Sequence, residues 1–323
     1  MKLIDKFGNF QFDILELPSR GIFYNIDRSF VYVKYLTAKE ENILSTPALS
    51  ETDQALDIVI ESVLLDDIKV DELLSVDRKA IILFLRSTSF GDSFELEVPC
   101  SNCSTRNVQS FRFSMLEMSD VEINNKTEFS VNLKLKEDGD FYLIKFKPLT
   151  YGQEKEVKSK GENHLITNTT ISQIFEIEYN HKNQDSEDMG FVKIVYNDKD
   201  YIKRFVTTRP LKKFQELRKK MEKRLPGIIE ELSCECPNCG QFDKIPFEVN
   251  DSLLKLEARY RTNFEEEIFL IQYYGKGGFD KESLYNTSIL SRRKTLERIN
   301  NEIEKKNKAE EDAVNKAKSK KGR

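Results

Sequence analysis

Hydrophobic and polar residues alternate in two pairs of short segments, each pair separated by a turn. Residues 9–17 and 29–35 alternate around a turn that contains proline and glycine. Residues 128–135 and 140–147 repeat this arrangement around an Asp-Gly turn. Because a period of two is typical of strands with one buried face, each pair predicts a β-hairpin. The chain is therefore expected to form this element twice.

Each predicted hairpin leads directly into the start of a helix. Thr37 and Glu40 follow the first hairpin, and Thr150 and Gln153 follow the second. This spacing is that of a capping box, in which the threonine hydroxyl accepts a hydrogen bond from a backbone N–H and the acidic or amide side chain reaches back to the cap. We therefore expect helices to begin at both positions.

Apolar residues recur every three or four positions in later segments and predict further helices. Residues 53–64 and 75–87 show this period in the first half, and residues 210–225 show it in the second. We interpret these stripes as core rather than as cofactor contacts. The second half also contains a polar, strand-like segment at 171–205, with an exposed loop expected at 180–190.

Four of the five cysteines form two Cys-x-x-Cys motifs at matching places in the two halves. Residues 91–113 align with residues 227–249 without a gap and are identical at seven of 23 positions, which indicates an internal duplication. A Cys-x-x-Cys turn between two strands provides two thiolates, and two such turns provide the four soft ligands of a tetrahedral structural zinc site. The predicted Zn²⁺ ligands are Cys100, Cys103, Cys236 and Cys239.

Two other interpretations of these cysteines stay open at the level of sequence. Each pair can sit in its turn as reduced thiols, or the ribbon can be a remnant that has lost its metal. Two motifs so far apart also require the fold to bring them together. The fifth cysteine, Cys234, aligns with Val98 at a strand position. We expect a small core residue there, although it could substitute for Cys236.

These patterns predict an α+β fold with two pseudo-repeated halves. Each half is expected to contain a β-hairpin, helices and a Cys-x-x-Cys zinc-knuckle hairpin, and a helical C-terminal extension follows. The predicted boundaries are 1–126 for the first half, 127–252 for the second, 253–306 for the helical segment and 307–323 for a charged tail.

The composition changes after the second Cys-x-x-Cys motif. Residues 265–274 predict a short helix, residues 275–278 a flexible joint, and residues from 288 onward a long helix. A narrow apolar stripe runs along the long helix, and we interpret it as a surface that docks on another protein. The stripe consists of Ile289, Leu296, Ile299 and Ile303. Beyond residue 307 nearly all residues are charged or small, and we expect disorder until a partner binds.

Charge is unevenly distributed along the chain. Its 323 residues carry a net charge of −4. Residues 292–323 contain 12 Lys and Arg against 6 Asp and Glu, a charge of +6, which leaves about −10 for residues 1–291. Binding to nucleic acid would therefore depend on the tail alone. A zinc-ribbon protein that binds nucleic acid or regulates is the alternative function. The acidic body argues against it, as do Phe111 and Phe247, whose alternating strand positions suit core packing.

Membrane insertion and secretion are not expected. No apolar run approaches the roughly 20 residues of a membrane helix. Residues 1–10 contain no apolar stretch of signal-peptide length. Cys-x-x-Cys pairs in such a chain are more typical of metal ligands than of disulfides. The composition therefore predicts a soluble intracellular protein.

The sequence offers little support for catalysis. The two histidines, His164 and His181, lie in polar segments remote in sequence from any cysteine. A hydrolytic zinc site with an open coordination position therefore has no evident ligands. The chain contains no P-loop, no GxSxG and no GxGxxG motif. We therefore predict a protein that is not an enzyme.

Several motifs together resemble one protein family. Residues 17–21 (LPSRG) are followed by Phe23-Tyr24, then by residues 36–41 (LTAKEE) and the first Cys-x-x-Cys hairpin. Residues 273–278, the Leu284-Tyr285 pair, Arg292-Arg293 and the Lys/Ala/Asn-rich end continue the likeness. In these motifs the chain is similar to the baseplate hub subunit family of T4-type tailed phages.

The resemblance implies a structural or assembly role. Such a protein would be a component or an assembly factor of the baseplate hub, and its partners would be other baseplate hub proteins. It would act in the cytoplasm of the infected bacterium during assembly and could remain in the virion tail baseplate. No catalytic residues come with the resemblance.

Overall fold

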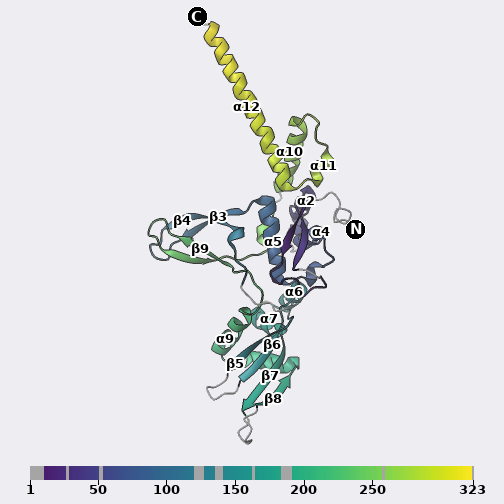
Figure 1. The fold of residues 1–323 in the computed structure, drawn as a ribbon, viewed down its shortest axis with the longest axis vertical. Coiled ribbons are helices and arrows are strands. Elements are labelled where there is room, and N and C mark those ends of the chain that lie inside the picture. Colours follow the sequence, from purple (N-terminus) through teal and green to yellow (C-terminus); the bar gives the residue numbers. More distant parts are fainter. Residues whose placement is uncertain are drawn as a thin grey trace.

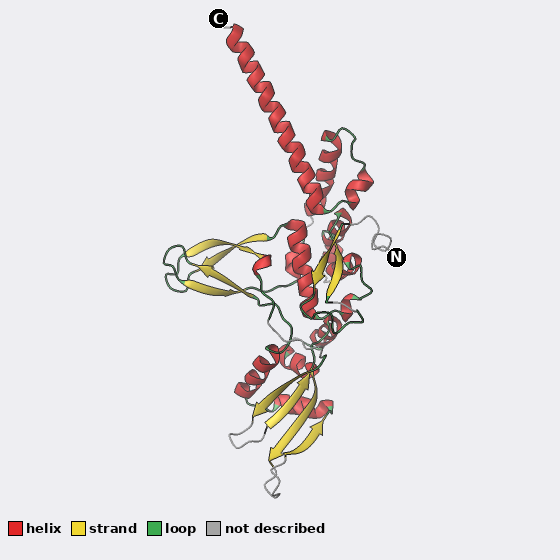
Figure 2. Ribbon diagram, viewed as in Figure 1, coloured by secondary structure: helices red, strands yellow, loops and turns green. Residues whose placement is uncertain are grey.

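The computed structural model describes residues 11–26, 29–50, 54–119, 127–134, 141–161, 164–182, 191–256 and 259–321. It confirms the predicted α+β class, since helices and small antiparallel sheets alternate along the chain. A central body carries a lobe of two hairpins on one side, a sheet lobe at one end and a long projecting helix at the other (Figures 1 and 2). None of the helices in the described ranges is long and apolar enough to span a membrane.

The central body contains the first predicted hairpin and its helices. The hairpin pairs Phe12 with Lys34 at one end and Glu16 with Phe30 at the other. Its apolar side chains join the helices in one buried cluster, so the expected core stripes are confirmed. The elements are β1 (Phe12–Glu16), β2 (Phe30–Lys34), α2 (Ala38–Leu44), α3 (Pro47–Ser50), α4 (Gln54–Val63), η1 (Val70–Glu72) and α5 (Ser75–Phe90).

Both predicted capping boxes are present. Thr37 caps α2, and Glu40 returns a carboxylate oxygen to the Thr37 backbone N–H at 2.9 Å. Thr150 and Gln153 make the equivalent contacts at the start of the later helix α6. Glu40 is fully buried, and its second oxygen accepts a hydrogen bond from Lys34 at 2.9 Å. The cap therefore also ties the end of β2 to the helix that follows.

The sheet lobe contains the second predicted hairpin. Its sheet is antiparallel with the order β5-β6-β7-β8. The predicted strand-like segment, 171–205, supplies the second pair of strands, but its last residues differ from the prediction and form a helix from Lys199. The expected Asp-Gly turn at 138–139 and most of the expected loop, 183–190, lie outside the described residues. The elements are β5 (Phe129–Lys134), β6 (Phe141–Phe146), α6 (Tyr151–Ser159), α7 (Leu165–Gln173), β7 (Ile174–Lys182), β8 (Phe191–Tyr196), α8 (Lys199–Thr207) and α9 (Leu211–Glu222).

The two Cys-x-x-Cys hairpins form a lobe of their own, here called the knuckle lobe. One hairpin follows α5 and the other follows α9, so strands from both predicted halves pack together (Figure 1). Alternate side chains such as Val98, Phe111 and Leu232 form its small core. The elements are β3 (Ser93–Pro99), β4 (Arg106–Arg112), η2 (Phe113–Met115), β9 (Glu231–Glu235) and β10 (Phe242–Pro246).

The chain ends in a helical segment in which α10 and α11 pack on α2, while its first element, η3, packs on α5. Its elements are η3 (Asp251–Leu254), α10 (Arg259–Tyr274), α11 (Lys281–Asn286) and α12 (Ile289–Lys321). The predicted disorder from residue 307 differs from the structure, in which α12 continues to Lys321. The physical reason is composition, because the Ala, Glu and Lys residues of this stretch have high helix propensity even where nothing packs against them.

The apolar stripe of α12 packs largely on its own chain. Ile289 is fully buried in the core of the central body. Leu296 and Ile299 pack against a cluster formed by α2, α10 and α11. Ile303 is partly exposed. Ile289 is therefore not available to dock on another protein, which corrects the prediction for this residue. Leu296 and Ile299 make their contacts within this chain. Helix α12 is held by α10, and the sequence pattern did not indicate this contact.

Candidate metal centre and interlobe junction

The four predicted ligand cysteines lie together at the tip of the knuckle lobe. Their sulfur atoms all lie within 4.8 Å of one another, although the two motifs come from different hairpins. The Sγ atoms of Cys100 and Cys239 are 3.6 Å apart, and those of Cys103 and Cys236 are 3.7 Å apart. All five cysteines of the chain are free thiols. The four sulfurs could hold a metal ion.

The sulfur spacing fits a tetrahedral thiolate site. Zinc–sulfur bonds of about 2.3 Å in a tetrahedron place neighbouring sulfurs about 3.8 Å apart. A disulfide would need about 2.05 Å between sulfurs. The observed contacts of 3.6 and 3.7 Å therefore match the edges of a metal tetrahedron and not a pair of disulfides.

Matching backbone turns place the two cysteine pairs. The Cys100 N–H donates to Thr105 O at 3.0 Å, and the Cys236 N–H donates to Gln241 O at 2.8 Å. Each turn then needs a left-handed residue one position after the second cysteine. Ser104 fills this place with φ 57° and Gly240 with φ 72°. Glycine adopts the left-handed region at little cost, whereas a serine there is less favourable. The turn therefore requires this backbone conformation in both hairpins.

Asparagine side chains surround the sulfurs in a reciprocal pattern. Asn102 donates from Nδ2 to Cys239 Sγ at 3.7 Å, and Asn238 donates to Cys103 Sγ at 3.6 Å. Asn107 adds a contact to Cys236 Sγ at 3.5 Å. Such donors stabilise thiolates and orient metal ligands. The sequence analysis did not single out Asn102 and Asn238, although their identity in the aligned repeat is a usable signal.

The thiols titrate differently because of these contacts. The Thr105 hydroxyl and the Asn238 amide hold the pKa of Cys103 down to about 5. The backbone N–H of Cys103 lowers the pKa of Cys100, but burial and the neighbouring thiols outweigh this effect and raise that pKa to about 11. The Cys103 thiolate thus forms easily, whereas ionisation of Cys100 is disfavoured. A cation among the four sulfurs would offset this effect.

Cys234 lies apart from the four-sulfur cluster. It pairs with Asp243 in the β9–β10 ladder and packs, half-buried, against the core of the knuckle lobe. Burial raises the pKa of its thiol. The prediction of a small core residue at this position is confirmed.

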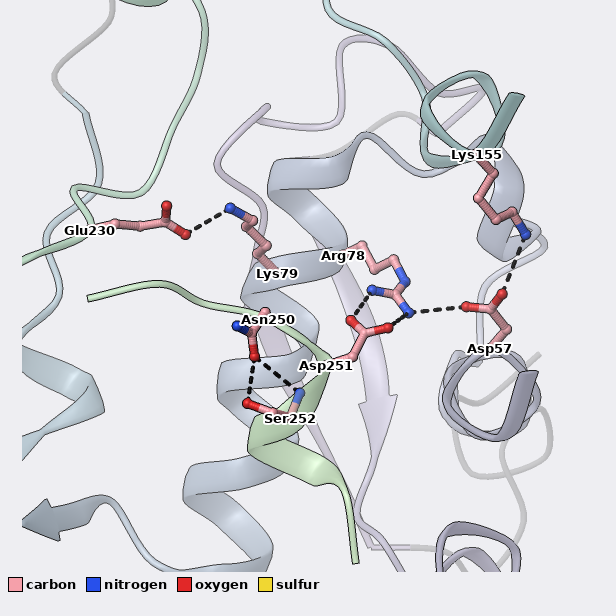
Figure 3. A network of polar contacts seen from close by, with 8 residues as sticks. All are labelled: Asp57, Arg78, Lys79, Lys155, Glu230, Asn250, Asp251 and Ser252. Carbon is pink, nitrogen blue, oxygen red and sulfur yellow. Dashed lines mark hydrogen bonds and ion pairs between the residues drawn. The ribbon is translucent and has the colours of Figure 1, made fainter. Parts of the chain in front are cut away.

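A second polar cluster joins the lobes at Arg78 on α5 (Figure 3). Its guanidinium donates to both carboxylate oxygens of Asp251, at 2.6 and 2.9 Å, and to Asp57 at 3.0 Å. It also stacks over the ring of Tyr151, 4.0 Å from the centroid. Lys155 on α6 contacts the other oxygen of Asp57 at 3.3 Å. Helices α4, α5 and α6 and the chain returning from the knuckle lobe therefore meet at one buried arginine.

The chemistry of this junction is that of a structural contact. Burial lowers the pKa of Arg78, but the hydrogen bonds and charge of Asp251 raise it overall. Lys79 extends the junction by an ion pair with Glu230 at 2.7 Å. A cavity of about 500 Å³ lies beside it and is lined by both acidic and basic side chains. No motif in the sequence pointed to these residues, because they are distant from one another along the chain.

Comparison with known proteins gives a match to a family model. A family model described as T4 bacteriophage base plate protein matches residues 16–255, which are 240 of the 323 residues. This range includes both Cys-x-x-Cys hairpins and ends before α10. No curated protein matches the chain. No solved structure matches it either.

Proposed function

This chain belongs to the T4 bacteriophage base plate protein family, and from that premise we propose that it is a non-enzymatic structural or assembly protein of the central hub of the tail baseplate. The family is one of baseplate proteins, so the virion tail baseplate and its other proteins are the location and partners that follow. The assignment to the hub is supported by the motifs in residues 17–24 and 36–41. The likeness noted for residues 273–278 lies beyond the matched range and remains a prediction.

We further propose that Cys100, Cys103, Cys236 and Cys239 hold a structural Zn²⁺. The observation that carries this proposal is the convergence of four thiols from two hairpins within 4.8 Å. Four thiolates fill the tetrahedral coordination of zinc and leave no position for a reacting water, which fits a structural and not a hydrolytic role. The ion would clamp two hairpins whose shared core is small.

Other features support a role without catalysis. The charges at the junction are engaged with one another, as Arg78 is with Asp57 and Asp251. His164 directly precedes α7 in the sheet lobe, whereas the cysteines lie in the knuckle lobe. Neither arrangement provides a nucleophile with a general base beside it.

Recovery of the tagged full-length chain from infected cells tests the function. The proposal expects mass spectrometry to find other baseplate hub proteins bound to it, in assembly intermediates, in mature particles or in both. A matched culture that expresses the tag alone controls for unspecific capture. Recovery with no baseplate protein would contradict the proposal. Tight, salt-sensitive binding of the purified chain to random DNA or RNA would favour the nucleic-acid alternative instead.

A further inference from the structure

The two hairpins of the knuckle lobe are joined by a carboxylate as well as by their small core. Asp243 on β10 accepts two hydrogen bonds from Ser101, which lies between Cys100 and Cys103 in the first hairpin. The Ser101 backbone N–H donates to one carboxylate oxygen at 3.0 Å, and the Ser101 hydroxyl donates to the other at 2.5 Å. One side chain of the second hairpin therefore holds the turn of the first.

The aligned repeat shows that this contact exists on one side only. Asp243 aligns with Asn107, and Ser101 aligns with Pro237. Proline has no backbone N–H, so the second turn cannot offer the same pair of donors. Asn107 instead donates from Nδ2 to Cys236 Sγ at 3.5 Å. The two equivalent positions thus act differently, because Asn107 contacts a sulfur directly and Asp243 acts through the opposite turn.

The turn that Asp243 holds carries two of the four ligand sulfurs. Those of Cys100 and Cys103 lie 3.6 and 3.7 Å from their partners in the second hairpin. The same turn contains Ser104 in the left-handed region, which is less favourable for serine than for glycine. Contact with the second hairpin therefore supports a turn whose own residues do not favour its conformation.

We propose that Asp243 is a positioning residue for the metal site, and that its hold on Ser101 fixes Cys100 and Cys103 at the spacing that zinc requires. This inference rests on the proposed zinc site. Ligands that are ordered before the ion arrives bind it more tightly, because less ordering is left to oppose binding. The outer contacts of a metal site act in this way on the ligands they orient.

The charge of Asp243 acts in the opposite direction. A carboxylate close to four thiolates adds to their negative charge and disfavours the thiolate form. Asp243 is only partly buried, so water and salt screen this repulsion. The two hydrogen bonds need no such charge to fix the turn. We therefore expect the positional effect to exceed the electrostatic one.

The zinc affinity of the full-length chain, measured by competition with a chromogenic chelator, tests this role. Asp243→Ala should bind zinc about 10–100-fold more weakly than native protein, the usual loss when an outer contact of a metal ligand is removed. Ser101→Pro removes both donors and introduces the residue that the equivalent turn carries at Pro237, so it should weaken zinc binding equally. The double variant should bind as the single variants do, because both substitutions remove one shared contact.

Asp92 provides the matched control. It accepts the same pair of hydrogen bonds from Ser114, at 2.9 and 2.6 Å, at the end of the β3–β4 hairpin opposite to its cysteines. Asp92→Ala should leave the zinc affinity unchanged, even where it lowers the melting temperature. Asp243→Asn keeps a carbonyl oxygen that can accept from the Ser101 N–H, and it should recover part of the lost affinity.

Cobalt(II) bound in place of zinc reports on the ligand geometry of the same variants. Native and Asp92→Ala proteins should show the visible absorption of a tetrahedral four-thiolate site, and Asp243→Ala should show weaker, shifted bands. Native zinc affinity in Asp243→Ala, or an equal loss in Asp92→Ala, would overturn the positioning role and leave the zinc site standing. Native protein that binds no zinc would overturn the zinc site itself, and the positioning role with it.

Discussion

Cys234 and Cys236 are two positions apart, yet their surroundings give them different roles. Cys236 is buried with three other thiols around it, whereas Cys234 packs beside the core of the knuckle lobe. At the scale of single residues, proximity along the chain therefore says little about chemistry. Residues two apart on a strand share a face, but β9 ends at Glu235, and the turn that follows brings Cys236 to the other three sulfurs.

Cys236→Ser is expected to destabilise the knuckle lobe strongly. Loss of one ligand from a structural zinc site removes binding free energy that is also folding free energy, so we expect a loss on the order of 3–5 kcal/mol. Differential scanning calorimetry of the full-length protein measures it. Cys234→Ser is the matched control and should cost less than about 1.5 kcal/mol. Equal losses in the two variants would contradict the proposed ligand set.

Arg78 is the residue on which the interlobe junction depends. Arg78→Ala leaves the half-buried Asp57 and Asp251 without their common partner, so we expect a loss of about 1–3 kcal/mol. Arg78→Lys keeps the charge but loses the two-pronged contact with Asp251, so its loss should be intermediate. Urea unfolding curves of both variants check the order. A fully stable Arg78→Ala protein would show that the junction does not hold the lobes.

At the scale of elements, helix α12 has two parts with different surroundings. Its first turns belong to the body, since Arg292 is fully buried and forms ion pairs with Glu41 and Glu267. The side chains of residues 307–315 are all exposed. The helix is therefore anchored at one end and projects from the molecule at the other (Figure 1).

Two truncations should separate these parts. Ending the chain after Thr287 removes Ile289 and Arg292 and leaves Glu41 buried without its cation, so the melting temperature should fall markedly. Ending it after Lys306 removes only the exposed part of the helix and should leave melting unchanged. Both proteins should keep their metal, because the cysteines lie in another lobe. Similar melting of the two truncated proteins would contradict the anchoring role of Arg292.

The sheet lobe should lose stability in acid through Glu178. Contacts with Lys145 and then Lys193 lower the pKa of Glu178 from its ordinary 4.5 to about 2. A carboxylate with a lowered folded-state pKa stabilises the fold above its ordinary pKa, and this stability is lost as pH falls through the folded value. Native protein should thus weaken from about pH 4.5 down to 2. Glu178→Gln should show a flatter profile in calorimetric scans over this range, and an equally steep profile would contradict it.

At the scale of the whole molecule, the sequence predicted elements better than their assembly. Alternation, capping boxes and apolar periods located the hairpins, α2, α5, α6 and α9 because these signals are local. The internal repeat also pointed to the four cysteines. Whether the two halves arose by duplication, and where the predicted domain boundaries fall, remains a prediction.

Contacts between distant segments could not be read from the sequence. The acidic partners of Arg78 and Arg292 lie far from them along the chain, and no periodicity marks such pairs. The partner of the stripe on α12 is α10 of the same chain. The sequence does not show where α10 lies in the fold, and the stripe was therefore interpreted as a docking surface for another protein. A narrow apolar stripe shows that a helix packs, but not on what.

The zinc clamp is the claim from which the structural account of this baseplate protein starts, and X-ray absorption at the zinc edge of the purified full-length chain tests it most directly. The account predicts one zinc per chain, bound by four sulfur ligands at about 2.3 Å. Cys100→Ser protein, purified in parallel, should contain little zinc. A native protein with well under one zinc per chain and all thiols reduced, or with nitrogen and oxygen ligands in place of the four sulfurs, would contradict the account.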